Sequence, residues 1–374
     1  MNQHQTAERK SVRPALIISK RTVSLYSPLL ERLMVGLANE SIPIALVCPS
    51  DYDVDSIAHG AVEVIRQPAV DLPLITWLNI KKLVQCLAAF KPTILHCLCE
   101  SKSSLTMQLS SQLDLPYLLT VNSIWRKWRQ LPALSKHCLR IITPAGSIAA
   151  SVAAAYPKFA DRLEQINAGT FVEESAGCFT DTGRLPSMIA VANRGNEAQF
   201  ESLLAAVKRM ADEGYQFMLF ITATGRAETA LRKSITKRGL SQIVIIIPEL
   251  KPWRVLLTAA DIFIQPAPSD DFNLLLLEAM SLGTAVVACR GGVDDFVIEG
   301  RTAAVFDPND KLSLKKTIQQ LLDKPQLARS LAAGAQQYLR ENHTVTAMVS
   351  SILRIYSEAP IRLLSVVCRR SSGG

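Results

Sequence analysis

The chain has 374 residues, more than twice a typical domain, and so predicts two domains. Lys and Arg number 41 against 33 Asp and Glu, a net charge of +8, which suits an anionic ligand or a membrane surface without deciding between them. Hydrophobic residues make up 48%, too many for a disordered protein, and only 17 residues are glycine, few for a protein with glycine-rich ligand loops.

Several other classes of protein are excluded by the same survey. No apolar run approaches the roughly 18 residues that cross a bilayer. The first 13 residues are polar and charged, without the apolar core of a secretory signal. The eight cysteines are scattered through apolar runs, as expected of reduced thiols in a cytosolic protein, and no Cys or His group has metal-ligand spacing. We therefore expect a cytoplasmic protein without a bound metal.

Apolar runs and amphipathic stretches alternate through the first half of the chain. Leu29, Leu33 and Leu37 form one stripe at helical spacing, and similar stripes follow. Strand and helix in alternation indicate a parallel sheet with helices on both faces. The strand-like runs are residues 15–19, 42–48, 93–98, 117–121 and 139–143.

The same alternation restarts in the second half, after a stretch rich in glycine and proline that ends near Ser187. We expect an α/β protein with two Rossmann-like, doubly wound domains that face a cleft. The strand-like runs here are residues 188–192, 217–222, 243–247, 262–265, 285–289 and 303–306. The expected divisions are a disordered tail (1–13), an N-terminal domain (14–175), a linker (176–187), a C-terminal domain (188–345), and a helix that returns to the first domain, with a tail (346–374).

Residues 259–310 are the most informative stretch, with the pattern strand, acidic loop, helix, strand and Gly-Gly turn. The loop at residues 266–273 opens a helix, whose free backbone N–H groups and partial positive charge suit a diphosphate. Asp270 lies in that loop, and Glu278 follows about two helical turns later. Gly291 and Gly292 end the next strand, where the backbone can approach a ligand closely.

This stretch resembles the donor site of the retaining glycosyltransferases of family 4, which have the two-domain GT-B fold. Gly225 stands in the place of that family's Gly-x-Gly turn, and residues 94–124 resemble its first-domain segment that places a His after a strand. The resemblance covers about residues 14–358. The matching positions in the donor stretch are Ser269, Phe272, Glu278, Ala279, Met280, Gly283, Gly291, Gly292, Asp295 and Gly300.

The resemblance implies a sugar transfer from a nucleoside diphosphate sugar to a glycan or lipid-linked acceptor, with retention of configuration and without a metal or other cofactor. Glu278 would bind the donor ribose, Asp270 would face the sugar hydroxyls, and the acceptor would bind the N-terminal domain. The residues implied in catalysis are Asp270, Glu278 and His96. Those implied in donor binding are Arg194, Gly225, Ser269, Asp271, Phe272, Asn273, Leu274, Glu278, Gly291 and Gly292.

The chain departs from the family pattern at several of these positions. Asp270 stands where the family has Glu, and Asp271 and Asn273 replace two glycines of the loop. The two cations expected beside the diphosphate fall on Asn193 and Ala198, with Arg194 adjacent to the first. A catalytically inactive binding or assembly partner in glycan synthesis is therefore the alternative, and a nucleotide-releasing sugar epimerase is a weaker one. The glycine-rich loop after the first strand is also absent, and Asn122 stands where a second His is expected.

Each candidate also has a structural interpretation. Taken without the motif, Glu278 could be an exposed residue of a helix, and Asp270 and Asp271 could cap that helix. His96 could be a core histidine whose ring nitrogens are hydrogen-bonded within the fold. The aromatic and basic run from Trp125 to Arg129 predicts a peripheral contact with the inner face of the membrane, or a loop beside an acidic acceptor, or a packed amphipathic turn. The tail at residues 361–370 fits a second membrane contact. No nucleic-acid motif accompanies these residues.

Overall fold

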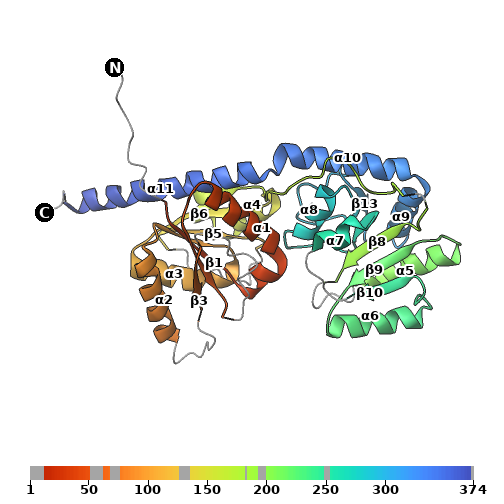
Figure 1. Cartoon of the computed structure of the whole chain (residues 1–374), viewed down its shortest axis with the longest axis horizontal. Coiled ribbons are helices and arrows are strands. Elements are labelled where there is room, and N and C mark those ends of the chain that lie inside the picture. Colours follow the sequence, from red (N-terminus) through yellow and green to blue (C-terminus); the bar gives the residue numbers. More distant parts are fainter. Residues whose placement is uncertain are drawn as a thin grey trace, which may run out of the picture. The chain divides into compact units, whose positions relative to one another are not determined.

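The chain forms two compact α/β units, each built on a parallel sheet (Figure 1). The computed structural model describes residues 12–50, 62–67, 76–125, 135–181, 183–192, 199–247 and 253–371, with side chains in the last helix to Ala359. One unit comprises residues 1–169 and 345–374, and the other comprises residues 170–344. The expected fold class, two doubly wound parallel-sheet domains, is thereby confirmed.

The first unit holds seven parallel strands in the order β3-β2-β1-β4-β5-β6-β7. The chain builds outwards from β1 to β3 and then crosses over to β4, so the strand order reverses beside β1. The elements are β1 (Pro14–Ile17), α1 (Lys20–Asn39), β2 (Ile44–Cys48), β3 (Val62–Arg66), α2 (Thr76–Phe90), β4 (Ile94–Cys97), η1 (Glu100–Lys102), α3 (Ser103–Leu113), β5 (Tyr117–Thr120), β6 (Cys138–Thr143), α4 (Gly146–Ala155), η2 (Pro157–Arg162), β7 (Leu163–Gln165) and α11 (Val345–Ser371).

The turn after β1 explains the missing glycine-rich loop. The helix α1 begins almost at once, with Ser19 as its N-cap, and Ser19 and Thr22 form a capping box, each side chain accepting a hydrogen bond from the other's backbone N–H. Ser19 has an extended backbone at φ −116°, so this tight connection requires no positive φ. The helix bends at Tyr26, two residues before Pro28, as expected of a proline inside a helix.

The long helix α11 belongs to the first unit and packs against α1. Gly36 makes the close approach possible, because a Cβ atom built on it would lie 2.4 Å from Cγ2 of Val349. Met348, Ile352 and Tyr356 are buried in the same core as the α1 leucines. The last helix is thus part of the first unit's core, although more than 170 residues separate it from β7.

The second unit repeats the topology with six parallel strands in the order β10-β9-β8-β11-β12-β13. The order reverses between β8 and β11, and ligands of open α/β sheets bind at such a point. The elements are β8 (Ser187–Val191), α5 (Phe200–Asp212), β9 (Met218–Thr222), α6 (Arg226–Lys237), β10 (Val244–Ile247), α7 (Trp253–Thr258), β11 (Ile262–Gln265), α8 (Leu274–Ser281), β12 (Ala285–Cys289), β13 (Ala304–Phe306), α9 (Ser313–Asp323) and α10 (Pro325–Asn342).

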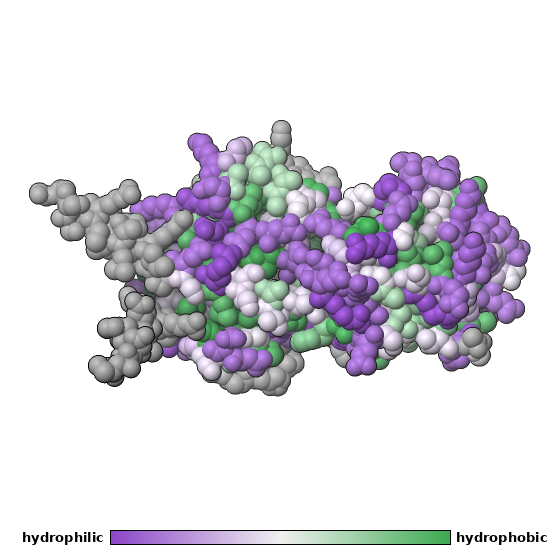
Figure 2. Space-filling view, turned by 90° about the horizontal axis from the view of Figure 1, so that it is seen from above, coloured by the Kyte–Doolittle hydropathy of each residue, from purple (hydrophilic) through white to green (hydrophobic). Residues whose placement is uncertain are grey.

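The amphipathic helix α10 closes the second unit. Its apolar side buries Leu331, Ala335 and Leu339, while Gln337 and Arg340 are exposed. Hydrophilic residues accordingly cover much of the surface over this unit in the view from above (Figure 2). In the described part of the chain, no helix combines the length and the apolar character needed to cross a membrane.

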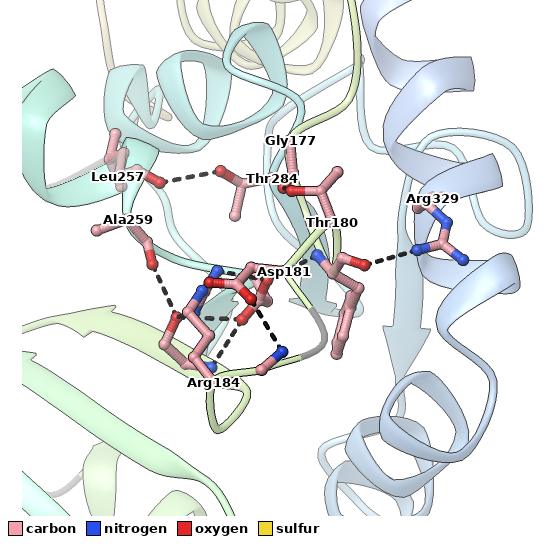
Figure 3. Close-up of polar contacts among 12 residues, drawn as sticks. Gly177, Thr180, Asp181, Arg184, Leu257, Ala259, Thr284 and Arg329 are labelled. Carbon is pink, nitrogen blue, oxygen red and sulfur yellow. Dashed lines mark hydrogen bonds and ion pairs between the residues drawn. The ribbon is translucent and has the colours of Figure 1, made fainter.

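The segment expected as a linker, residues 176–187, packs on the second unit. Cys178 and Phe179 lie in its core, and Arg329 of α10 donates a hydrogen bond of 2.6 Å to the Phe179 carbonyl (Figure 3). The buried carboxylate of Asp261 holds the other side of this segment. It accepts hydrogen bonds from the backbone N–H groups of Phe179 and Ser187, at 2.7 and 2.9 Å, and forms an ion pair with Arg184 at 2.9 Å.

We predict that Asp261→Ala lowers the free energy of unfolding by about 3 kcal/mol or more, because it leaves two buried N–H donors without an acceptor. Arg184→Ala should cost less than about 1 kcal/mol, since the Arg184 side chain is 36% exposed and its ion pair is screened by water. Urea unfolding of both variants measures the difference. Equal losses would show that the ion pair, rather than the N–H groups, fastens the segment.

Candidate functional site

The acidic loop predicted to bind the donor follows β11 and leads into α8. The Ser269 side chain stabilises the loop by two hydrogen bonds within it. Its Oγ donates to the Asp271 carbonyl at 2.7 Å and accepts from the Asp271 N–H at 3.1 Å. Asn273 is the N-cap of α8, and its side chain accepts from the Leu276 N–H at 3.2 Å. The capping residue is therefore Asn273, and the exposed Asp270 and half-buried Asp271 do not take that role. Phe272 is buried against Phe296, with ring centroids 5.8 Å apart.

Glu278 is buried on α8, with 1% of its surface exposed, which excludes the exposed helical position. One carboxylate oxygen accepts from the Thr170 hydroxyl at 3.1 Å, and the other pairs with Arg254 at 3.1 Å. Arg254 also pairs with Glu173 at 2.9 Å, so it bridges two carboxylates. The sequence analysis missed both Thr170 and Arg254.

The Gly-Gly turn brings the end of β12 close to the acidic loop. Gly291 has φ +94°, a conformation that favours glycine. A Cβ atom built on Gly292 would lie 3.8 Å from the Ser269 backbone nitrogen. Gly225 is the N-cap of α6, with φ +62°, and follows β9, which β8 separates from β11. The acidic loop, the Gly-Gly turn and Gly225 thus each follow the carboxyl end of a strand, where open α/β sheets bind ligands.

Arg194 follows β8 in the sequence. It lies outside the described residues, as do Asn193 and Ala198. Its predicted contact with the diphosphate therefore stays a prediction.

A buried carboxylate that the sequence analysis missed lies beside the acidic loop. Asp294 is 6% exposed, and its Oδ1 accepts from the Asn273 N–H at 2.9 Å. Burial raises the pKa of Asp294 to about 7, although the Asn273 N–H and the nearby Gln265 amide favour the ionised form. The signal was present in the sequence as a second aspartate directly before Asp295, but adjacent acidic residues in a loop usually indicate an exposed turn.

His96 lies in the first unit, at the end of β4, and is buried. Its Nδ1 is 2.7 Å from the Tyr356 hydroxyl, and its Nε2 is 2.9 Å from the Thr120 hydroxyl. Burial lowers the pKa of His96 to about 3, so the imidazole is neutral near pH 7. This geometry fits the satisfied core histidine, and a catalytic role for His96 stays a prediction. Asn122 also has a structural partner, because its side chain donates to the Leu98 carbonyl at 3.2 Å.

An apolar cavity of about 60 Å³ adjoins His96. It lies within the first unit, at the carboxyl ends of β4, β5 and β6, between α1 and α11. Three polar side chains border it, those of Thr22, Thr120 and Asn122, besides His96 and the Tyr26 hydroxyl. The remaining lining residues are Leu29, Leu30, Leu33, Leu98, Ile142, Pro144, Ile166, Ala168, Met348 and Ile352.

The aromatic and basic run is only partly described. Trp125 is 8% exposed and packs edge-on against Tyr156, with centroids 5.7 Å apart. Residues 126–129 and the side chains of residues 361–370 lie outside the described structure, so both predicted membrane contacts stay predictions. Among the residues that the structure describes, no group of three or more His, Cys, Asp or Glu side chains is arranged to hold a metal ion.

Comparison with known proteins supports the predicted class. Residues 183–338 match the family model of Glycosyl transferases group 1, and this range contains the acidic loop, Glu278 and the Gly-Gly turn. The resemblance of this segment to glycosyltransferases is confirmed.

Curated relatives match parts of the chain. The D-inositol 3-phosphate glycosyltransferase of Pseudarthrobacter chlorophenolicus is 27% identical over 205 residues, 52% of this chain and 46% of that protein. The lipopolysaccharide core biosynthesis mannosyltransferase LpcC of Rhizobium leguminosarum bv. viciae is 28% identical over 131 residues, 34% of this chain and 36% of that protein. The chain thus spans less than half the length of these two curated relatives.

Solved structures share the fold over nearly the whole chain. Anabaena Alr3699/HepE in complex with UDP and glucose superposes with a TM-score of 0.77 at 14% identity, over 93% of this chain and 100% of that one. A glycosyltransferase from Rickettsia africae ESF-5 gives a TM-score of 0.76 at 14% identity, over 93% and 98% of the two chains. These likenesses confirm the GT-B architecture.

We predict that Asp294 makes the stability of the protein depend on pH. Its pKa is about 7 in the folded state against an ordinary 3.8, so between these values the folded state binds more protons than the unfolded state. The free energy of unfolding therefore falls as pH rises from about 4 to 7, by about 2 to 4 kcal/mol for this group. Asp294→Asn should remove that loss and become more stable than the wild type above pH 7.

Urea unfolding at pH 5, 6, 7 and 8 measures the difference between variant and wild type. Asp212→Asn, the same chemical change at an exposed position in α5, is the control and should give a constant difference. A constant difference for Asp294→Asn as well would contradict the raised pKa.

Proposed function

We propose that this chain is a retaining glycosyltransferase, which moves a sugar from a nucleoside diphosphate sugar to an acceptor without a metal ion. The match of residues 183–338 to Glycosyl transferases group 1 supports the reaction class. The complex of Anabaena Alr3699/HepE with UDP and glucose supports a nucleoside diphosphate sugar as donor. Retention and the absence of a metal ion are taken from the sequence resemblance.

The meeting of the acidic loop with the Gly-Gly turn carries this proposal. Both lie at the carboxyl ends of adjacent strands, β11 and β12, and a Cβ atom built on Gly292 would be in contact with the Ser269 backbone nitrogen. The start of α8 adds a partial positive charge at the same place, although Asn273 already caps the Leu276 N–H. This charge attracts a diphosphate, and a sugar attached to it would lie beside the exposed Asp270.

The ion pair of Glu278 favours a second candidate, a protein that binds or assembles partners without catalysis. Both oxygens of Glu278 are engaged, by Thr170 and Arg254, so this carboxylate already has a structural function. A carboxylate has about four lone-pair positions and can accept ribose hydroxyls in addition. The two candidates therefore differ in whether Glu278 also contacts a nucleotide.

We predict that the protein binds one nucleoside diphosphate of the set UDP, GDP and ADP, together with a sugar ester of the same nucleotide. Glu278→Gln should weaken the binding of both about 10- to 100-fold, because hydrogen bonds from ribose hydroxyls to a charged oxygen are lost. Isothermal titration calorimetry in EDTA measures the affinities and tests the metal-free part of the proposal.

The matched control is Glu341→Gln, an exposed position in α10, which should bind as the wild type does. Unfolding curves show that each variant is folded. A folded wild type that binds none of these ligands would favour the non-catalytic candidate, whereas donor hydrolysis that is lost in Glu278→Gln would exclude it.

The apolar cavity of the first unit supports a lipid-linked acceptor over a free glycan. It opens at the carboxyl ends of β4, β5 and β6, where doubly wound sheets bind ligands. Its walls are mainly Leu, Ile and Met side chains, which gain free energy from contact with an alkyl group and none from contact with a sugar hydroxyl. A cavity of about 60 Å³ accommodates a short part of such a chain.

We predict that the wild type transfers sugar faster to an octyl glycoside than to the corresponding methyl glycoside, and that Ala168→Leu loses this preference. Ala168 is buried in the cavity wall, so the longer side chain occupies the space of the alkyl group. Ala168→Ser, which adds a single atom, should keep the preference. Initial rates with both acceptors measure it, and an equal fall for both would contradict the proposed alkyl site.

A further inference from the structure

Two buried polar atoms at the carboxyl ends of β11 and β12 have no hydrogen-bond partner among the described residues. They are Nε2 of Gln265 and Oδ2 of Asp294, and both side chains are only 6% exposed. Leaving such an atom unpaired costs about 1–3 kcal/mol, and more for a charged group. The Gln265 side chain lies close enough to favour the ionised form of Asp294, but neither atom has a partner within hydrogen-bond geometry, and a ligand that pairs with both would satisfy them.

Both atoms border the same space, above the backbone of Gly292. A Cβ atom built on Gly292 would lie 3.9 Å from Nε2 of Gln265 and 4.0 Å from Oδ2 of Asp294. The Ser269 backbone nitrogen lies 3.8 Å from the same point. These are ordinary contact distances, so the Gln265 amide and the Asp294 carboxylate face the same side of Gly292, next to the Ser269 nitrogen.

The surrounding structure holds the Asp294 carboxylate in place. The Asn273 N–H donates to Oδ1 at 2.9 Å, which leaves Oδ2 as the unpaired oxygen. Asn273 in turn caps α8, so the position of the carboxylate is tied to the start of that helix. Gln265 is the last residue of β11, in register with Ala288 of β12. The pair thus stands on rigid elements beside the acidic loop.

We propose that Gln265 and Asp294 form a subsite for one hydroxyl group of the donor sugar. A hydroxyl can accept a hydrogen bond from the Gln265 amide and donate one to the Asp294 carboxylate, so it satisfies both atoms at once. A phosphate oxygen carries no proton at neutral pH and would face the carboxylate with a like charge. This inference rests on the proposed function, and it assigns sugar recognition to two residues outside the family motif quoted above.

The arrangement selects for one hydroxyl in one orientation. A deoxy sugar, or an epimer with that hydroxyl turned away, leaves a buried amide and a buried carboxylate unpaired. Sites of this type reject such analogues far more strongly than an apolar pocket rejects a missing methylene. The pair therefore determines which sugar is accepted, while Glu278 acts on the nucleotide.

Calorimetry on the full chain at pH 8, where Asp294 is ionised, tests the subsite. The ligands are UDP, GDP and ADP and their glucose, galactose, mannose and N-acetylglucosamine esters. For Asp294→Asn and Gln265→Met, we expect at least a tenfold loss of affinity for the sugar ester that the wild type prefers. Affinity for the nucleoside diphosphate alone should not fall in either variant, because Asp294→Asn only removes a negative charge that repels the diphosphate, and Asp212→Asn should leave both affinities unchanged.

Stability separates recognition from folding in this experiment. Asp294→Asn is expected to be more stable than the wild type at pH 8, so weaker sugar binding by that variant cannot come from a damaged fold. Sugar-ester affinities that remain unchanged in both variants would overturn the subsite. Equal losses for the nucleoside diphosphate and its sugar ester would also overturn it, because the pair would then act on the nucleotide part.

A wild type that binds no nucleotide would contradict the proposed function. The subsite is then tested with free sugars. Saturation-transfer NMR with glucose, galactose and mannose detects weak contacts with the full chain. A contact that disappears in Asp294→Asn would support the hydroxyl subsite independently of any nucleotide. No contact with any of the three sugars would overturn it.

Discussion

A carboxylate that leaves water must find hydrogen-bond donors, and the second unit depends on this constraint at three positions. Asp261, Glu278 and Asp294 are all at least 94% buried. Asp261 has two backbone N–H groups and Arg184, and it fastens the segment that leads into β8. Glu278 has Thr170 and Arg254. Asp294 is the exception, because its Oδ2 has no partner in the described structure. Asp261 is fully paired and serves the fold, whereas the incompletely paired Asp294 indicates a ligand.

The sequence predicted the framework of this site better than its contacts. Alternating strands and helices, the acidic loop and the Gly-Gly turn are local sequence patterns, and the structure contains all of them. The loop and the turn lie at the carboxyl ends of the strands. The partners of Glu278 could not be predicted in this way, because Arg254 and Thr170 lie 24 and 108 residues away along the chain. His96 is similar, since Tyr356 lies 260 residues beyond it. Local periodicity carries no information about such pairs.

Glycine shows where composition was a poor guide. The absence of glycine after β1 suggested a lost ligand loop, but the capping box at Ser19 makes that turn without one. Gly36, by contrast, lies in a helix where propensity disfavours it, and it is there because α11 approaches α1 too closely for a side chain. Neither fact is visible without the tertiary structure. The glycine count therefore says less about the proposed activity than the positions of Gly225, Gly291 and Gly292, which follow the carboxyl ends of β9 and β12.

Electrostatics around the acidic loop connect the fold to the proposed reaction. Asp270, Asp271, Glu278 and Asp294 would repel a diphosphate, since two like charges 4 Å apart repel by about 4 kcal/mol at an effective dielectric of 20. Arg254 offsets the charge of Glu278, and burial keeps Asp294 partly protonated near pH 7. Asp270 and Asp271 are more exposed, so water screens them. The two most buried negative charges are thus the two that the structure neutralises, by an ion pair in one case and by a proton in the other. With these two charges neutralised, an anionic donor can approach the start of α8.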